Sequence, residues 1–174
     1  EISRRIAYLF KFPRGYAVGR AAKWSRIHEL LDEFGLEDLL KDGKPVAIAM
    51  KAPSADDLYT GVYDFLIFDV DSKNMKDAQK VTDSICNKLL NEGKTFLLTF
   101  SGSKGYHVFL FLKSPVSGKD AINWQGNFLK QLGAVRDKVN RYVLGGCGID
   151  TQITEARGDG QIIKLPMSAH IAKK

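Results

Sequence analysis

The first sixty residues contain two short hydrophobic runs separated by a longer amphipathic stretch. The run RIAYLFKF predicts a strand, and VAIAMK (46–51) predicts a second one. Between them, AAKWSRIHELLDEFGLEDLLKDG has apolar residues at helical spacing, which predicts one or two helices that break near Gly35 and end at Gly43. The polar segment APSADD, which contains Pro53, predicts a connector. We therefore expect residues 1–60 to form a small α/β accessory part.

The hydrophobic pattern becomes more regular from residue 63. Residues 63–70 form a nearly continuous apolar run, which is typical of a buried strand. Apolar residues then recur every three or four positions as far as Gly93, which predicts an amphipathic helix. The repeating positions are Met75, Ala78, Val81, Ile85 and Leu89. TFLLTF (95–100) and YHVFLFL (106–112) predict two strands on either side of the polar, glycine-rich segment SGSKG.

The last third of the chain completes a recognisable order of elements. A second long helix is expected from about Asp120 to Leu144, before GGCG. IDTQIT and QIIKLPM predict two strands that pair around EARGDG, where Asp159-Gly160 is a turn signal. The order strand, helix, strand, strand, helix, strand is that of the ferredoxin-like split βαβ arrangement. In that fold the first and third strands are neighbours at the centre of the sheet, and both helices cover one face.

The predicted fold class is therefore α+β, with an RRM-like, ferredoxin-like βαββαβ core in residues 61–174 and the accessory part before it. The chain has no initiator Met and stops abruptly at HIAKK, so we expect it to be a fragment of a longer protein with further domains.

Composition narrows the class of protein. The content of 44% hydrophobic and 26% charged residues is that of a soluble globular protein. Neither a bilayer-spanning run nor a signal peptide is evident, so we expect a cytoplasmic protein with no membrane partner. The net charge of +6 suits a polyanionic partner. Cys86 and Cys147 are too few for a disulfide scaffold or a four-ligand zinc site, so we expect reduced thiols and no zinc.

Two aspartates end the first core strand, in FLIFDVDS. Side chains two positions apart on a strand share a face, so Asp69 and Asp71 lie about 6.6 Å apart along the strand. Neighbouring carboxylates repel each other and are costly to desolvate, and a bound Mg²⁺ or Mn²⁺ would compensate both effects. The alternative is a strand end that reaches solvent, with Asp71 or Ser72 capping the following helix.

The segment SGSKGYH is the second candidate for chemistry. Its glycines permit tight turns that expose backbone N–H groups, and its serines and lysine add donors and positive charge, so it could cradle phosphates. The alternative is a flexible connection between two strands. The residues concerned are Ser101, Gly102, Ser103, Lys104 and Gly105. His107 begins the next strand, which the ferredoxin-like order places beside Asp69 and Asp71.

Two later residues complete the set of candidates. Asp150, which follows GGCG, could supply a third carboxylate to a metal site or could be an ordinary turn residue. Lys164 is a cation within the apolar run IIKLPM, which indicates either an anionic partner or a long side chain that reaches solvent.

Together these motifs resemble the archaeo-eukaryotic primase (AEP) superfamily. FLIFDVDS, FSGSKGYHVFLFL, GIDTQIT and IIKLPMSAH follow one another in that family's order over residues 63–170. The combination is most similar to the primase-polymerase branch, which includes the ligase D polymerase domain, mobile-element replication primases and CRISPR-associated primase-polymerases. The resemblance implies an RRM-like catalytic core and a template-dependent nucleotidyltransferase that adds nucleotides to a 3′-hydroxyl or starts primers.

The resemblance also implies roles for individual residues. Two divalent ions, Mg²⁺ or Mn²⁺, would be held by Asp69, Asp71 and Asp150. The triphosphate of the incoming nucleotide would be bound by Ser101, Lys104 and His107. Lys164 stands where the family often has an arginine, which implies a phosphate contact, and Arg157 could add another. The implied partners are nucleic-acid template and primer, together with nucleoside triphosphates.

Two other function classes remain open at this stage. A non-catalytic, RRM-type RNA-binding module would use KGYHVFLF (104–111) as its RNP1 motif, although His107 and Val108 depart from that pattern. A metal-dependent nuclease would also use three carboxylates and two metal ions. Asp69 and Asp71 on the neighbouring strand would lie against nucleic-acid phosphate, which disfavours the RNA-binding module. The Ser-Gly-rich segment with Lys104 favours a triphosphate substrate over the nuclease.

Overall fold

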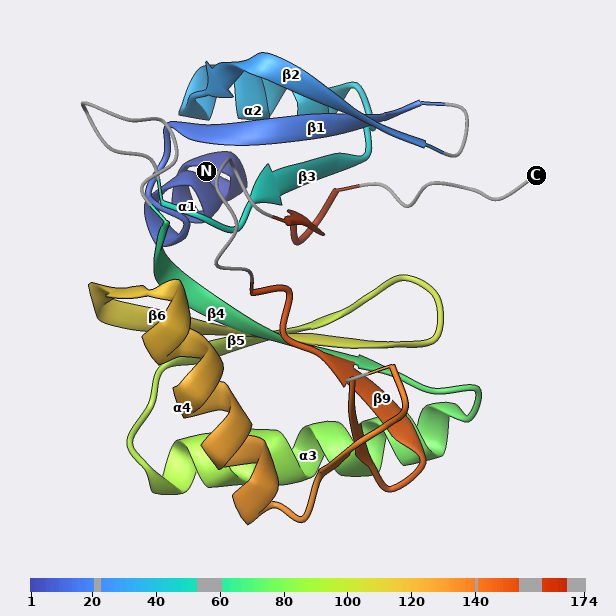
Figure 1. Cartoon of the computed structure of the whole chain (residues 1–174). Helices are drawn as coiled ribbons and strands as arrows, with labels where there is room; N and C mark the ends of the chain where they lie inside the picture. Colours follow the sequence, from blue (N-terminus) through green and yellow to red (C-terminus); the bar gives the residue numbers. More distant parts are fainter. Residues whose placement is uncertain (21–22, 53–60, 140, 154–160, 169–174) are drawn as a thin grey trace. The chain divides into compact units, whose positions relative to one another are not determined.

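The structure, a computed structural model, describes residues 1–20, 23–52, 61–139, 141–153 and 161–168. Contacts divide the chain into two compact units (Figure 1). Unit 1 comprises Glu1–Tyr63 and Thr154–Lys174, and unit 2 comprises Asp64–Ile153. Among the helices of the described residues, none is long and apolar enough to cross a membrane.

Unit 1 is built on a four-stranded antiparallel sheet with the order β10-β3-β1-β2. Its elements are α1 (Ile2–Leu9), β1 (Arg14–Arg20), β2 (Lys23–Leu31), α2 (Glu33–Lys41), β3 (Val46–Ala49) and β10 (Ile162–Lys164). Arg14 is fully buried, and its guanidinium donates hydrogen bonds to the carbonyl oxygens of Phe10, Ala49 and Lys51. This buried cation therefore ties the start of β1 to the end of β3.

Two of the elements predicted for the N-terminal part are wrong. RIAYLFKF belongs largely to α1 and is not a strand, because Ile6, Ala7 and Phe10 share one buried helical face. Residues 23–31 form β2 and not a helix, because this segment pairs with the whole length of β1. Gly35 lies inside α2, whose first turn is capped by Asp32: its Oδ1 accepts a hydrogen bond from the Gly35 N–H at 2.8 Å.

Unit 2 contains a six-stranded sheet with the order β5-β6-β4-β9-β8-β7. Its elements are β4 (Val62–Asp71, which begins in unit 1), α3 (Met75–Asn91), β5 (Phe96–Phe100), β6 (Gly105–Ser117), α4 (Gly118–Gln131), β7 (Val135–Arg136), β8 (Tyr142–Leu144) and β9 (Cys147–Asp150). The central order β5-β6-β4-β9 is the ferredoxin-like one, with the first and third core strands as neighbours. The predicted fold class is confirmed.

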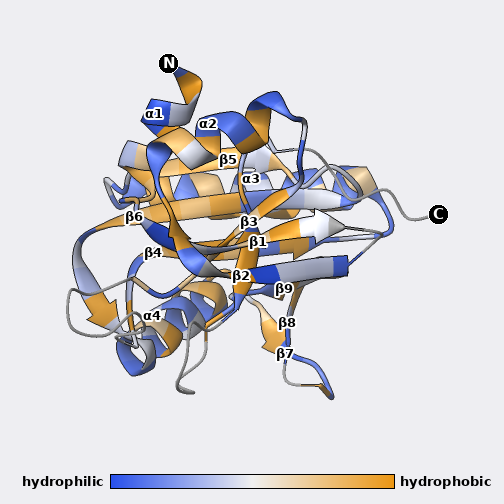
Figure 2. Ribbon diagram, turned by 90° about the horizontal axis from the view of Figure 1, so that it is seen from above, coloured by the Kyte–Doolittle hydropathy of each residue, from blue (hydrophilic) through white to orange (hydrophobic). Residues whose placement is uncertain are grey.

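Both helices of unit 2 lie on one face of this sheet (Figure 1). Phe68 of β4 packs against Trp124 and Phe128 of α4, with ring centroids 6.4 Å and 5.2 Å apart. The ammonium of Lys88 on α3 lies 5.3 Å from the centre of the Phe128 ring, so the two helices also contact each other. In Figure 2, β4 and β6 are mainly hydrophobic, whereas α4 shows both hydrophobic and hydrophilic residues, as expected for a helix packed on one side.

The predicted second helix is wrong beyond Gln131. The helix ends there, and Gly133 follows with a φ of +87°, a conformation that suits glycine. The chain then forms the short edge strands β7 and β8, which the apolar spacing alone does not distinguish from helix. Tyr142 of β8 instead packs against α4, where only a glycine, Gly126, leaves room for its hydroxyl.

The predicted pairing of IDTQIT with QIIKLPM is also wrong. The first segment contributes to β9, which pairs with β4 and β8 in unit 2. The second contributes β10, which pairs with β3 in unit 1: Ile163 lies opposite Ile48. The predicted turn at Asp159-Gly160 lies outside the described residues.

Candidate functional site

Three carboxylates come together on one face of the sheet of unit 2. Asp69 of β4 lies directly opposite Asp150 of β9 in the antiparallel register, and Asp71 lies opposite Gly148. Residues paired in this way have Cβ atoms about 5 Å apart and project to the same side. We call Asp69, Asp71 and Asp150 the carboxylate cluster. It lies on the face opposite Phe68, whose ring packs against α4.

Helix capping does not account for the two aspartates of β4. The N-cap of α3 is Asn74, whose Oδ1 accepts a hydrogen bond from the Lys76 N–H at 3.0 Å. Ser72 closes the preceding turn by accepting a hydrogen bond from the Asn74 N–H at 3.1 Å. Asp71 is the last residue of β4 and has neither role, so its carboxylate is available to the cluster.

The segment SGSKG (residues 101–105), which we call the SGSKG loop, is held against the end of β4. The Ser101 N–H donates to the Gly105 carbonyl at 2.9 Å, which closes the loop, and the Ser72 N–H donates to the Lys104 carbonyl at 3.2 Å. A side chain at Gly105 would collide with the carbonyl oxygen of Val70. Gly102 has a φ of +91°, which also favours glycine. Close backbone approach therefore fixes the loop beside the carboxylate cluster.

Two basic side chains from this region face the cluster. Lys104 Nζ lies 3.4 Å from Asp71 Oδ2, and both side chains are substantially exposed. His107 Nε2 lies 3.4 Å from Asp69 Oδ1. His107 is buried and packs edge-on against Phe109 at a centroid distance of 5.8 Å, which fixes the direction of its ring. The histidine and the three aspartates thus share one side of the sheet, as the ferredoxin-like order required.

Electrostatics in the cluster disfavour three ionised carboxylates without a counterion. Burial, followed by the negative charges of Asp71 and Asp150, raises the pKa of Asp69 to about 7. A hydrogen bond from Gln152 and the charge of Lys104 act in the opposite direction and only partly offset these effects. Positive charge placed among the carboxylates would remove the repulsion and restore ionised Asp69.

The donor set of the cluster suits hard divalent cations. Carboxylate oxygens are the preferred ligands of Mg²⁺ and Mn²⁺, and a divalent cation among them would favour the ionised form of Asp69, whose pKa is raised. In the described ranges, no three His, Cys, Asp or Glu side chains are positioned so that they could hold a metal ion as they stand. Asp150 Oδ1 accepts a hydrogen bond from the Gln152 N–H at 2.9 Å, and Asp71 faces Lys104. Rotation of these exposed carboxylates would be needed to complete the coordination.

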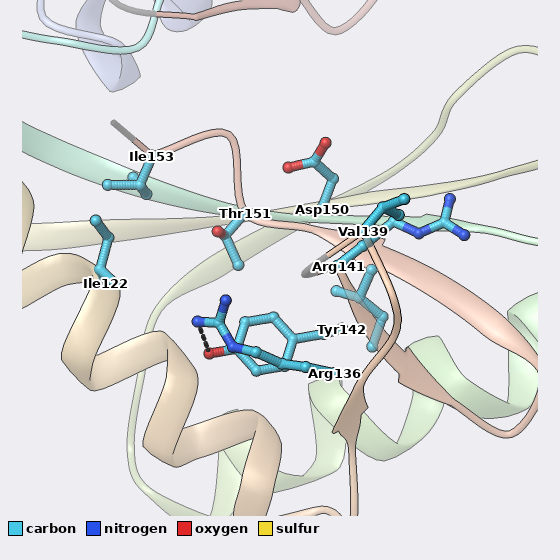
Figure 3. Close-up of a pocket in the computed structure, with 9 residues that line it drawn as sticks. Ile122, Arg136, Val139, Arg141, Tyr142, Asp150, Thr151 and Ile153 are labelled. Atoms are coloured by element: carbon cyan, nitrogen blue, oxygen red, sulfur yellow. Dashed lines mark hydrogen bonds between the residues drawn. The ribbon is translucent and has the colours of Figure 1, made fainter. Parts of the chain in front are cut away.

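The structure also reveals residues that sequence reasoning missed. The Arg141 guanidinium lies over Gly148, where an added Cβ would be 2.7 Å from Arg141 Cζ. Because Gly148 is opposite Asp71, this places a cation on the same face as the carboxylate cluster. Arg136 lies over the ring of Tyr142, 4.5 Å from its centre, and lines a pocket that reaches Asp150 (Figure 3). Gly148 belongs to the run GGCG, so the glycine content of that run is the feature of the sequence that could have pointed to Arg141.

Two predicted phosphate contacts are not part of unit 2. Lys164 lies on β10 of unit 1, where it is half-buried and burial lowers its pKa. Arg157 lies outside the described residues. The phosphate role of both remains a prediction.

Both cysteines are buried and free, as reduced thiols are expected to be. Burial, followed by the charge of Asp83, raises the pKa of Cys86 to about 11, and burial raises that of Cys147. A raised pKa leaves little thiolate at neutral pH, so neither cysteine has the character of a nucleophile.

Comparison with solved structures identifies a similar fold. The chain resembles the polymerase domain of Mycobacterium tuberculosis ligase D, in a structure of that domain in complex with DNA, with a TM-score of 0.60 and 18% sequence identity. The alignment covers 92% of this chain and 60% of the ligase D chain, so the present chain spans less than two thirds of that structure. No family model and no curated protein matches the sequence. The chain has the fold of a ligase D polymerase domain, and the resemblance predicted from its motifs is confirmed at the level of the fold.

Proposed function

We propose that this chain is the catalytic part of a template-dependent nucleotidyltransferase of the primase-polymerase type. The observation that carries the proposal is the register of β4 and β9, which sets Asp69 opposite Asp150 on the face shared with His107. Two strands distant in the sequence thus supply carboxylates to one place, next to a loop of phosphate-binding character. The similarity of the fold to a polymerase domain supports the same reading.

The reaction is the transfer of a nucleotidyl group to a 3′-hydroxyl. The hydroxyl oxygen forms a bond to the α-phosphorus, the bond from that phosphorus to the pyrophosphate oxygen breaks, and the hydroxyl proton passes to water. Asp69, Asp71 and Asp150 would hold two Mg²⁺ or Mn²⁺ ions. When bound, such ions supply positive charge that makes the hydroxyl more acidic and stabilises the departing pyrophosphate.

The SGSKG loop and His107 would bind the triphosphate. The turn at Gly102 suits a loop that presents backbone N–H groups, and Lys104 and His107 add cationic and hydrogen-bonding groups on the side of the cluster nearest β6. In the structure, Lys104 faces Asp71 and His107 faces Asp69. Divalent cations bound by the carboxylates would replace Lys104 and His107 as their partners, and both side chains would then be available to contact a phosphate.

Neither rival class explains the arrangement as well. An RRM stacks bases on the exposed face of its central strands, but here that face carries Asp69, Asp71 and Asp150, which repel phosphate. A nuclease could use the same carboxylates, but it has no need of a triphosphate-binding loop beside them. The polymerase, nuclease and RRM-type classes give different outcomes in the same mixture, so one assay separates them.

The test is incubation with labelled nucleoside triphosphates, a primed template and Mn²⁺. Longer products support the proposal, shortened nucleic acid supports a nuclease, and binding without any product supports an RRM-type module. The double variant Asp69→Ala with Asp71→Ala should lose incorporation entirely while keeping its fold, because removing paired carboxylates relieves repulsion.

A matched control is the double variant Asp77→Ala with Asp83→Ala. It removes the same charge from α3, where Asp83 is exposed and Asp77 is half-buried, and should incorporate nucleotides like the unmodified protein. Full incorporation by the Asp69/Asp71 variant would refute the assignment of the site.

A further inference from the structure

A cavity of about 570 Å³ lies on the face of the unit 2 sheet that α3 and α4 cover (Figure 1). It is lined by the turn after α3, by β4 and β6, and by the first turns of α4. We call it the α3–α4 groove. Leu66 in its floor lies two positions before Phe68, which packs against α4, so both side chains are on the same face of β4. The groove is therefore on the opposite face of the sheet from the carboxylate cluster.

The interior of the groove is mainly apolar. Trp124 forms one wall, and its ring is stacked on that of Phe128 at a centroid distance of 5.2 Å, so packing fixes its orientation. Trp124 is only half-buried, and so are two of the other apolar lining residues, which leaves apolar surface in contact with solvent. A cavity of this size and character is suited to an apolar group of a ligand. The other apolar side chains of the lining include Leu66, Leu110, Leu112, Val116 and Ala121.

The charged residues around the groove leave an excess of positive charge. Glu92 Oε1 is paired with Lys88 Nζ at 2.9 Å, and Asp120 Oδ2 accepts a hydrogen bond from the hydroxyl of the α4 N-cap residue at 2.7 Å. Both carboxylates of the lining thus have partners within unit 2. Lys94 and Lys113 also line the groove and are exposed, and neither has a carboxylate within ion-pair distance among the described residues. The two lysines favour an occupant that carries negative charge beside its apolar groups.

The edge of β6 is open along the same groove. β5 pairs with β6 as far as Leu110, and one further hydrogen bond joins the Phe111 N–H to the Thr95 carbonyl at 3.3 Å. β6 continues beyond this point, and β5 is the outermost strand of the sheet, so no strand of the described residues lies beside that part of β6. Backbone groups alternate between the two edges of a strand, so the N–H and C=O of Lys113 point to the same edge as those of Phe111. An extended chain could pair with β6 there.

We propose that the α3–α4 groove docks an extended segment of a partner protein, in which apolar side chains are flanked by acidic ones. The open edge of β6 favours a peptide over a compact small molecule, because it offers main-chain groups for strand addition. Alternate side chains of the added segment would enter the groove against Trp124, and its acidic residues would contact Lys94 and Lys113. Because the carboxylate cluster is on the other face, a docked partner leaves the cluster accessible, and the inference does not depend on the proposed function.

The probe is a fluorescein-labelled peptide of sequence DELILVEE, which has apolar residues between acidic ends. Two control peptides separate these features: DESGSSEE keeps the charge without the apolar residues, and KRLILVKK keeps the apolar residues with the charge reversed. Fluorescence anisotropy with the full chain measures the affinities. DELILVEE should bind about tenfold more tightly than either control peptide. Equal affinities for the three peptides, or no binding of DELILVEE, would overturn the proposal.

The double variant Lys94→Glu with Lys113→Glu tests whether the groove is the site. It should weaken the binding of DELILVEE about tenfold and should bind KRLILVKK more tightly than the unmodified protein does. The matched control is Lys76→Glu with Lys80→Glu, which reverses the same charge at exposed positions of α3 that do not line the groove. Circular dichroism melting shows that each variant retains its fold. Equal losses of affinity in the two double variants would indicate attraction to the net charge alone and would overturn the assignment.

Two further measurements report on the groove itself. In a Trp24→Phe background, binding of unlabelled DELILVEE should shift the emission of Trp124 to shorter wavelength, because the peptide removes water from the indole. Hydrogen exchange followed by NMR should show the Lys113 amide exchanging about tenfold more slowly in the complex, because strand addition gives it a hydrogen-bond partner. Unchanged Trp124 emission or unchanged exchange at Lys113 would refute docking along β6. Binding of the anionic dye ANS in the groove without binding of DELILVEE would also overturn the proposal, in favour of a small-molecule site.

Discussion

The substitution Asp69→Asn tests the electrostatics of the carboxylate cluster most sharply. It keeps the size of a side chain that is 19% exposed and removes its ability to ionise. Burial and the charges of Asp71 and Asp150 raise the pKa of Asp69 from 3.8 to about 7. A difference of about three pKa units corresponds to roughly 4 kcal/mol, which is an upper bound for the strain that ionised Asp69 places on the metal-free fold.

The sign of the pH dependence follows from proton binding. Between pH 4 and pH 7 the unfolded chain has lost the Asp69 proton while the folded chain retains it, so this residue makes stability fall as pH rises through that window. Above pH 7 both states are ionised and the contribution is constant. Metal-free Asp69→Asn should therefore be more stable than the unmodified protein at pH 8, by about 2–4 kcal/mol, and similar to it near pH 4.

Urea denaturation monitored by Trp124 fluorescence measures this difference. A Trp24→Phe background removes the tryptophan of unit 1, so the signal reports unit 2, where Trp124 packs against Phe68. Asp83→Asn, on the exposed face of α3, is the isosteric control and should not change the pH profile. A loss of stability in Asp69→Asn at pH 8 without metal would refute the electrostatic reasoning, as would a control that gains as much stability.

Three further predictions concern the same site. The affinity for Mn²⁺, measured by calorimetry, should be about tenfold weaker at pH 6 than at pH 8, because protons compete for Asp69; equal affinities would contradict this. His107→Ala should raise the KM for nucleoside triphosphate about tenfold with little effect on template binding by anisotropy, and the reverse result would argue against a triphosphate contact. Gly105→Ala should lower the free energy of unfolding by about 3 kcal/mol because its methyl group meets the Val70 carbonyl, and an unchanged urea midpoint would show that β6 can move away from β4.

The core of unit 2 was predictable because its signals are local and strong. The apolar run that becomes β4 and the spacing of buried residues in α3 each specify one element without long-range information. The order of these elements then limited the topology to one that puts Asp69 near His107. The meeting of the two residues is thus a consequence of strand order and not of any contact visible in the sequence.

The elements predicted wrongly are those whose structure depends on distant partners. Residues 23–31 have helical spacing, but pairing with β1 makes them a strand. β10 contains three residues and finds its partner β3 more than a hundred positions away in the sequence. The local preference of both segments is weak, so pairing with a neighbouring strand decides their structure.

The pocket beside Asp150 was hidden from sequence reasoning for a related reason. Arg136 and Tyr142 fall where helical spacing predicted a continuing helix, and that interpretation would have pointed the two side chains in different directions. Only the turn after Gly133 and the pairing of β7 with β8 bring the guanidinium over the ring. The carboxylates, in contrast, followed from two-residue alternation along a strand whose identity was clear.

The central claim is that Asp69, Asp71 and Asp150 act together as ligands of divalent cations facing a bound triphosphate. A crystal soaked with Mn²⁺ and a nonhydrolysable nucleoside triphosphate, measured at the manganese absorption edge, tests this directly. We predict anomalous peaks among the three carboxylates, with the triphosphate against the SGSKG loop and His107. A nucleotide bound elsewhere, or manganese absent from the three aspartates while the nucleotide is present, would contradict the account.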